Sequence, residues 1–214
     1  LYSWRRICDP DKQKCNRGQP ETDDIDRTDA EQLFSSILDA EHLNRDQVME
    51  QAQYLNINLE GNFCVAELVF EKKGDNCEKG DSLTVGQNIK HMISTEFSFY
   101  INETILILPQ AGSILVLIPT TGLSERQIRD IFTRIADRVQ KEFGLHLCVG
   151  VGDSTAYLDE IRKSRNEASA AIRAAVASHM SGRIFFYRDQ GIYTLISHVD
   201  DTRILDKYVK QQLG

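Results

Sequence analysis

Histidine is the residue type in this 214-residue chain that first raises the question of chemistry, because imidazole binds metals and moves protons near neutral pH. His91, His146 and His179 fall on three different predicted elements, and no cysteine or carboxylate stands at metal-ligand spacing from them. Surface or packing histidines are therefore favoured over ligands. The chain also lacks the G-x-S-x-G pattern of a serine nucleophile and any Cys/His nucleophile pattern. We predict no catalytic residue and no metal site from these side chains.

A pair of glycines offers a second candidate site. Gly150 and Gly152 follow a predicted strand and precede a predicted helix, where a glycine turn can cradle a phosphate at a helix N-terminus. The full glycine fingerprint is absent, and Asp153 would repel an anion. We favour a structural turn from strand to helix, with phosphate binding as the alternative.

The cysteines indicate a reduced protein. There are five, at positions Cys8, Cys15, Cys64, Cys77 and Cys148. Their number is odd and no C-x-x-C pair occurs, which predicts free thiols in a cytoplasmic protein. Cys8 and Cys15 lack two further ligands at close spacing, so a zinc site is not favoured. No cofactor is predicted.

Charge and hydropathy argue against two classes of partner. A formal net charge of -7 and a pI near 5.3 argue against nucleic-acid binding by this chain itself, since phosphate contacts need clustered basic residues. No apolar run approaches the roughly 18 residues of a transmembrane helix, and no signal peptide is present, so no membrane contact is predicted. One predicted helix has a basic side, formed by Arg162, Lys163, Arg165 and Arg173. We favour a solvated face for this side over a docking surface for an acidic partner.

A predicted hairpin lies at the centre of the sequence pattern. Two apolar runs, at 105–108 and 114–118, are separated by five residues that include Pro109 and Gly112. The runs are nearly continuous rather than alternating. We therefore expect both strands to be buried on both faces in the middle of a sheet.

The remaining elements are predicted around this hairpin from their periodicity. Further strands are predicted at 63–70, 145–151 and 183–187. Helices are predicted from Asp29, at 45–54, at 85–97, between a capping box at Ser124 and Gly144, at 158–176, and in a tail near 205–209.

The order of these elements is β-α-β-β-α-β with a further α-β, which indicates a ferredoxin-like layout and its nucleotide-cyclase-type relatives. The predicted fold is α+β, an antiparallel sheet with helices on one face and short helices before it. We divide the chain into a polar linker at 1–28, ordered or disordered, a helical segment at 29–58, a main domain at 59–198 and a helical connector at 199–214.

Several segments resemble a known family. The sequence G-S-I-L-V-L-I-P at 112–119 resembles the central hairpin of GGDEF domains, the diguanylate cyclase fold. A finer similarity is to the degenerate GGDEF-like middle domain of PucR/CdaR-type (purine catabolism and sugar diacid) transcription regulators. It rests on G-V-G-D-S at 150–154, S-R-N-E-A at 164–168 and Y-R-D-Q-G-I-Y-T-L-I at 187–196, and extends over 29–214.

The chain departs from the cyclase pattern at the turn. Matching the five family positions gives Ala111, Gly112, Ser113, Ile114 and Leu115. Ser113 and Ile114 replace the two acids that the resemblance implies for holding metal ions, and either Glu67 or Glu71 on the first strand could supply one carboxylate. One carboxylate does not make a two-metal site, so the resemblance implies a protein that is not an enzyme.

The resemblance also implies a role. In that family this domain lies between a sensing region and a C-terminal helix-turn-helix domain, so we expect a regulatory module of a longer protein that contacts DNA only through a domain outside these residues. A homodimer is expected because regulators that read two half-sites need a two-fold partner. The ligand-binding residues and any small-molecule effector stay unknown. The alternatives are a small-molecule or nucleotide sensor that keeps the cyclase cleft, and a GGDEF-like segment of an AraC-type or two-component regulator.

Overall fold

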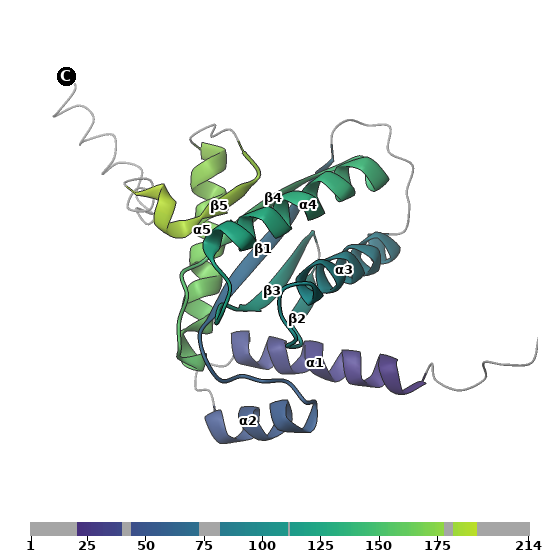
Figure 1. The fold of residues 1–214 in the computed structure, drawn as a ribbon, viewed down its shortest axis with the longest axis vertical. Coiled ribbons are helices and arrows are strands. Elements are labelled where there is room, and N and C mark those ends of the chain that lie inside the picture. The colour runs from purple at the N-terminus through teal and green to yellow at the C-terminus, as the bar shows by residue number, and fades with distance from the viewer. Residues whose placement is uncertain (1–20, 40–43, 73–81, 111, 178–181, 192–214) are drawn as a thin grey trace, which may run out of the picture.

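The computed structural model describes residues 21–39, 44–72, 82–110, 112–177 and 182–191. Its centre is one open five-stranded sheet in the order β2-β3-β1-β4-β5 (Figure 1). The neighbours pair antiparallel, except that β5 runs parallel to β4. The strands are β1 (Phe63–Lys72), β2 (Leu106–Gln110), β3 (Ser113–Pro119), β4 (Leu145–Val151) and β5 (Ile184–Phe186). The α+β class and the mostly antiparallel sheet confirm the prediction.

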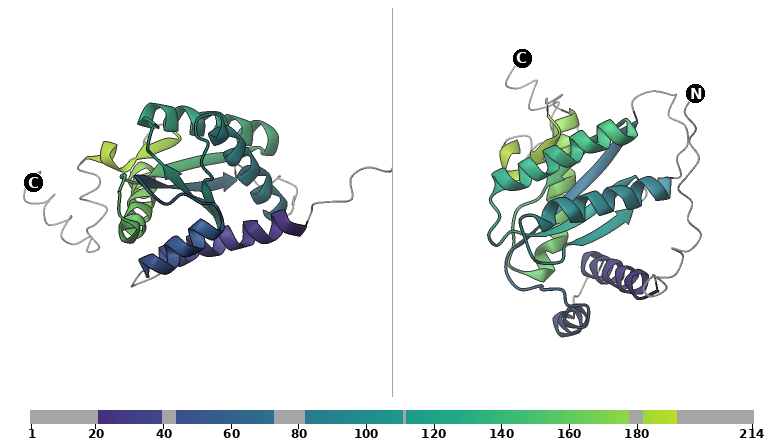
Figure 2. Two further views of the ribbon diagram at one scale, coloured as in Figure 1. Left: turned by 60° about the horizontal axis from the view of Figure 1, so that its bottom comes forward. Right: turned by 45° about the vertical axis from the view of Figure 1, so that its right-hand side comes forward.

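Helices cover both faces of this sheet (Figure 2). In the described part of the chain they are α1 (Glu21–Asp39), α2 (Arg45–Tyr54), α3 (Ser82–Ser98), α4 (Glu125–Phe143) and α5 (Ile161–Ala177). Alternate residues of β1 point to opposite faces. Ala66 and Leu68 join the core cluster under α3 and α4, whereas Phe63 and Val65 join the cluster under α1. The layer of helices that the sequence predicts on one face of the sheet therefore consists of α3 and α4. Helices α1 and α5 form a second layer on the opposite face.

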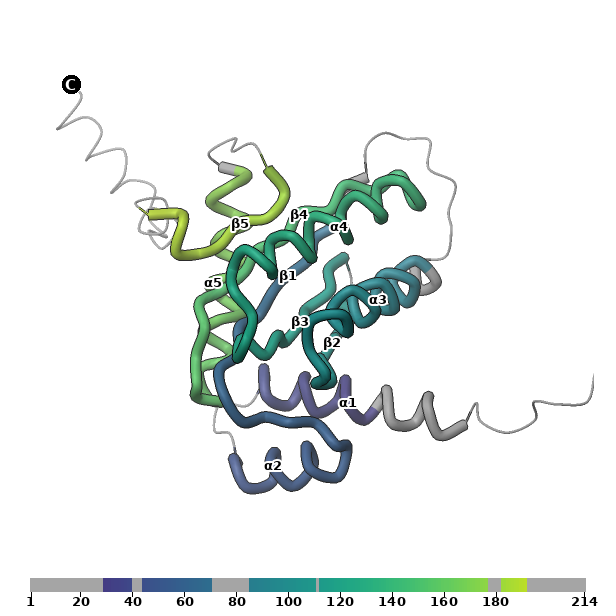
Figure 3. Tube along the Cα trace, in the orientation of Figure 1, coloured from purple at the N-terminus to yellow at the C-terminus, as the bar shows by residue number. Residues whose placement is uncertain are grey.

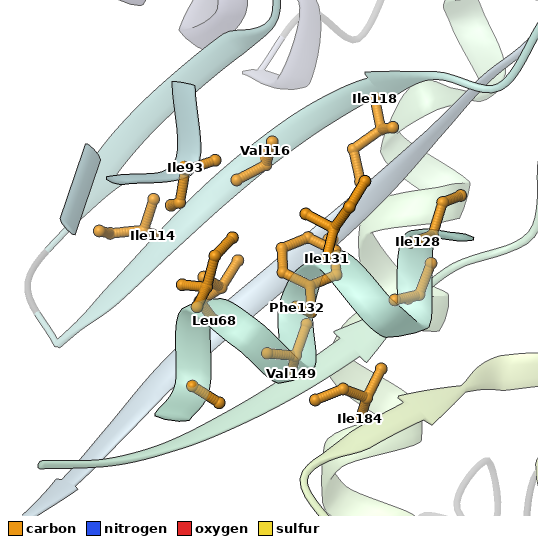
Figure 4. Packing of buried hydrophobic residues seen from close by; sticks show 14 of the residues in the cluster. Leu68, Ile93, Ile114, Val116, Ile118, Ile128, Ile131, Phe132, Val149 and Ile184 are labelled. Carbon is orange, nitrogen blue, oxygen red and sulfur yellow. The ribbon is translucent and has the colours of Figure 1, made fainter. Parts of the chain in front are cut away.

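The larger core cluster is filled by aliphatic and aromatic side chains from the sheet and from α3 and α4 (Figure 4). Leu68, Phe132 and Val149 are each fully buried. The Phe132 ring meets Phe97 edge to face with 5.5 Å between the ring centroids. This cluster fixes α4 across β1 and β4.

Helix α4 begins and ends where the sequence predicts. The Ser124 side chain accepts a hydrogen bond from the backbone N–H of Gln127, and the Gln127 side chain accepts one from the Ser124 N–H, which is a capping box. At the other end Gly144 has φ 66°, a left-handed conformation that glycine adopts without steric cost. Both predicted boundaries are confirmed because they depend on local signals.

The central hairpin differs from its prediction in two respects. Gln110 pairs with Ser113, so the connection is two residues long instead of five, and Pro109 lies inside β2. β2 is also an edge strand, and β3 is the hairpin strand buried on both faces. Proline is tolerated at an edge because it has no N–H to donate to a neighbouring strand, which explains how an apparent loop residue lies in the sheet.

The β2 edge is covered by the first helix. Helix α1 lies along β2, and α2 packs on α1 (Figure 3). Lys90 of α3 forms an ion pair with Glu31 of α1, so the helices of the two layers meet beside this edge. Covering an edge strand prevents unwanted pairing with another chain.

One further boundary differs from the sequence prediction. Helix α1 begins at Glu21 rather than at Asp29, so residues 21–28 are helical. In the last turn of α5, Val176 is 58% exposed, whereas Ala175 beside it is buried against Phe185 of β5, so Val176 lies on the outer side of the helix. Residues 1–20 and the predicted connector at 199–214 lie outside the described residues.

Candidate functional site

The hairpin turn between β2 and β3 is the site where the family pattern would place chemistry. Of its five matched positions, Ala111 lies outside the described residues. Gly112 has φ 87°, as a tight turn requires, and Ser113 is half-buried at the start of β3. The segment from β2 through β3 contains no acidic residue.

Ile114 and Leu115 are packing residues. Ile114 is 2% exposed and lies near Ile93 of α3 in the larger core cluster (Figure 4). Leu115 is fully buried on the opposite face, in the cluster under α1. A carboxylate at position 114 would be buried among aliphatic side chains, which is strongly unfavourable for a charged group. Position 114 therefore stabilises the core and has no ligand group to offer.

Glu67 of β1 is engaged elsewhere. It pairs across the sheet with Leu115, so its side chain lies on the α5 face, opposite to that of Ile114. There its carboxylate accepts a hydrogen bond from the Ser169 hydroxyl of α5. Glu71 lies further along β1, opposite His146, and its side chain is outside the described part of the structure. Glu67 thus links β1 to α5.

Three sequence segments that are far apart in the chain meet beside β4. We call Asp153, Ser164, Glu167 and Arg188 the Asp153 cluster. The backbone N–H of Asp153 donates to Glu167 at 2.9 Å, and its carbonyl accepts from the Ser164 hydroxyl at 2.8 Å. Arg188 donates to the Asp153 carboxylate at 3.3 Å and also pairs with Glu125. The segments at 150–154 and 164–168 and the described residues 187–191 of the third segment therefore share one polar network.

The two glycines of β4 allow α5 to pack closely on the sheet. A Cβ atom added at Gly150 would lie 2.1 Å from the Ala168 carbonyl oxygen, and one added at Gly152 would lie 2.0 Å from that of Ser164. Both distances are far inside van der Waals contact. This geometry supports the structural interpretation of the two glycines over a phosphate cradle, because the helix backbone fills the space beside them.

Ser164 is expected to contribute strongly to stability. Its hydroxyl is 2% exposed and also accepts the Val65 backbone N–H at 2.9 Å. Ser164→Ala leaves the buried Val65 N–H and the half-buried Asp153 carbonyl without this partner, and we expect the free energy of unfolding to fall by about 2 kcal/mol in urea denaturation. Ser98→Ala is the matched control, because that exposed hydroxyl bonds only Thr95 of its own helix, and it should change stability by less than about 0.5 kcal/mol. Equal effects of the two substitutions would contradict this role.

Glu167 makes stability depend on pH. Burial raises the pKa of this carboxyl above its ordinary value. The hydrogen bond from the Asp153 N–H and the charge of Lys163 lower the pKa, whereas the charges of Asp153 and Glu160 raise it further. Because the folded state binds this proton more tightly than the unfolded chain does, the contribution of Glu167 to stability falls as pH rises above the ordinary pKa of a glutamate. Compared with Glu167→Gln, the wild type should become progressively less stable over that range in urea denaturation. Parallel pH profiles would contradict the assignment.

Other candidate residues are not members of the Asp153 cluster, although Cys64 is close enough to interact electrostatically with Asp153 and Arg188. Burial raises the pKa of Cys64 to about 12, so its thiol is a poor nucleophile. His91 is exposed on α3, His146 is half-buried on β4, and His179 lies outside the described residues. Among the described residues, no group of three or more His, Cys, Asp or Glu side chains could hold a metal ion, and no helix is long and apolar enough to cross a membrane.

Sequence reasoning gave Arg188 and Glu125 no role. Arg188 is separated by 35 residues from Asp153 and by 63 from Glu125. No spacing rule along the chain predicts pairs this distant. The signal lay in the topology, since β5 must lie beside β4 for Arg188 to reach the start of α4.

Comparison with known proteins gives one family match. A family model described as a GGDEF-like domain matches residues 40–174. None of the curated protein sequences compared with the chain matches it.

Two structures are among the solved structures that resemble the fold. One is the regulator of polyketide synthase expression from Bifidobacterium adolescentis, with a TM-score of 0.56, 12% identity, and coverage of 82% of this chain and 61% of that one. The other is the active GGEEF domain of a diguanylate cyclase from Vibrio cholerae, with a TM-score of 0.46, 14% identity, and coverage of 73% and 95%. This chain spans 61% of the regulator's length, and at this identity the likeness concerns the fold alone.

Proposed function

Because this chain belongs to the family of GGDEF-like domains, we propose that it is a non-catalytic regulatory and dimerisation domain of a PucR/CdaR-type transcriptional regulator. It relays a signal to a helix-turn-helix domain outside these residues, and DNA is contacted only there. The segments at 150–154, 164–168 and 187–196 support the finer family assignment. A structural neighbour named as a regulator of expression supports the general role.

The observation that carries the non-catalytic assignment is the chemistry of the turn. Ser113 and Ile114 occupy the matched positions of the two acids, and Ile114 is buried in the core. Two-metal catalysis needs carboxylates that hold both ions at the reacting phosphates. Glu67 is directed toward α5 and bonds Ser169, so it does not replace them.

The test is a search for product. The purified chain is incubated with GTP and Mg²⁺, and the nucleotides are separated by chromatography beside a reaction with an active diguanylate cyclase. We expect no cyclic dinucleotide. Product that disappears in Glu67→Ala but persists in Glu60→Ala, an exposed carboxylate before β1, would overturn the proposal.

A second candidate is small-molecule sensing, and one cavity favours it. A cavity of about 350 Å³ lies between α4 and β5, lined by residues that include Arg129, Arg183 and Gln190. Gln190 is 3% exposed, and its Oε1 atom has no hydrogen-bond partner in the described part of the chain. This volume suits a small ligand. GTP binding without turnover would favour this second role.

The proposed location is the cytoplasm. Cys64 is a buried free cysteine, which is usual in a reducing compartment. An AraC-type or two-component regulator would differ mainly in its flanking domains, and the sequence of the complete gene would distinguish it from the PucR/CdaR type.

A further inference from the structure

A groove between α1 and α2 carries uncompensated negative charge. Its volume is about 700 Å³, and its lining includes Asp29, Ser36, Glu50 and Tyr54 but no basic residue. Neither Asp29 nor Glu50 forms an ion pair with any described residue. The Tyr54 side chain is 81% exposed, so an aromatic ring stands at the rim of this acidic groove.

A stripe along α5 has the opposite charge. We call Arg162, Asn166, Arg173 and Val176 the α5 stripe; their spacing places them on one side of the helix, and all four are exposed. Arg162 and Arg173 form no ion pair within the described residues, and Val176 adds an exposed apolar end.

Arginines on the other side of the sheet are mostly paired within the chain. On α4, and at Arg183 and Arg188, which flank β5, every described arginine except Arg126 forms an ion pair with a carboxylate of the same chain. Arg129, for example, bonds Asp189 at 2.9 Å. The acidic groove and the α5 stripe are therefore complementary surfaces that form no ion pair with the described residues of the same chain.

The two surfaces lie on the same side of the sheet. Helices α1 and α5 contact each other and cover the same face, with α2 packed outside α1 (Figure 2). Because both are outer surfaces of one rigid layer, the α5 stripe of a chain does not reach the groove of that same chain. A second copy facing this side presents its own stripe and groove.

We propose that this chain forms a two-fold dimer in which the α5 stripe of each copy docks in the acidic groove of the other. The inference rests on the dimer of the proposed function and assigns its surface. Two-fold symmetry requires that each contact occur twice, and an exchange of stripe and groove meets that condition. Groove against groove would place Asp29 and Glu50 near their own copies, which is repulsive. When α5 of one copy lies in the groove of the other, its arginines meet groove residues of opposite charge. They also meet the Tyr54 ring at the rim, which can make an aromatic contact with an arginine.

Sedimentation equilibrium of the 214-residue chain tests this assignment through charge reversal. The groove variant carries Asp29→Arg and Glu50→Arg, the stripe variant carries Arg162→Glu and Arg173→Glu, and a third protein carries all four. Each two-site variant should raise the dimer dissociation constant at least roughly 100-fold, because every reversed charge acts twice. The four-site protein should recover dimerisation, and the wild-type dimer should weaken at high salt.

The matched control reverses Arg126 and Lys141, exposed cations of α4 with no ion pair among the described residues, and should leave the dimer unchanged. This interface is overturned if the charge reversals in the groove or the stripe leave dimerisation unchanged. It is also overturned if the four-site protein does not recover dimerisation, while the proposed dimer stands in both cases. A wild-type chain that stays monomeric at all concentrations would overturn both, whereas the non-catalytic assignment is decided separately by the product assay.

Discussion

Gly152→Ala is expected to lower the free energy of unfolding by about 3 kcal/mol, measured by urea denaturation. The added Cβ atom would lie 2.0 Å from the carbonyl oxygen of Ser164 and 2.6 Å from its hydroxyl oxygen. Both are held in place by α5, so the helix must move away from β4. That movement also disturbs the hydrogen bond that the Ser164 hydroxyl accepts from the Val65 N–H and the one that it donates to the Asp153 carbonyl.

Gly86→Ala is the control for this substitution. Gly86 lies inside α3, and a Cβ atom there meets nothing within 4 Å. Alanine should stabilise the helix by about 0.5–1 kcal/mol. If Gly152→Ala were as stable as the wild type, α5 would not pack on β4 as closely as described, and a ligand-binding turn at 150–153 would have to be reconsidered.

Phe132→Ala is expected to cost about 3–5 kcal/mol of unfolding free energy, because it leaves a cavity in the centre of the larger core cluster. The ring is fully buried and packs edge to face on Phe97. Phe99→Ala removes the same group from a position that is 75% exposed and should cost less than about 0.5 kcal/mol. Similar urea midpoints for the two variants would show that α4 does not cover the sheet as described.

Local signals explain which parts of the fold the sequence predicted. The limits of α4 depend on Ser124, Gln127 and Gly144, which act within a few residues of themselves, and β4 matches its predicted range of 145–151. The hairpin connection was predicted too long because Pro109 suggests a loop, whereas an edge strand accommodates it. The parallel pairing of β5 and the second helical layer depend on contacts between distant segments.

The sequence predicted only part of the candidate site, because the rest also depends on contacts between distant segments. The match of the five turn positions to the family pattern, with no acid at Ser113 and Ile114, rests on the sequence alone. The burial of Ile114 follows from the predicted strand at 114–118, but a continuous apolar run does not reveal which side of the sheet each residue faces. In the sequence, the residues of the Asp153 cluster belong to separate motifs. The structure shows the topology that brings Arg188 to Asp153 and Glu125.

The central claim is that this domain acts through protein surfaces and not through a nucleotide bound at its hairpin. Calorimetric titration of Mg²⁺–GTP into the purified chain tests it most directly, with an active diguanylate cyclase as the positive control. We predict heats no larger than those of dilution, because Ser113 and Ile114 provide no carboxylate for the metal ions. A saturable heat with one nucleotide per chain would contradict the claim.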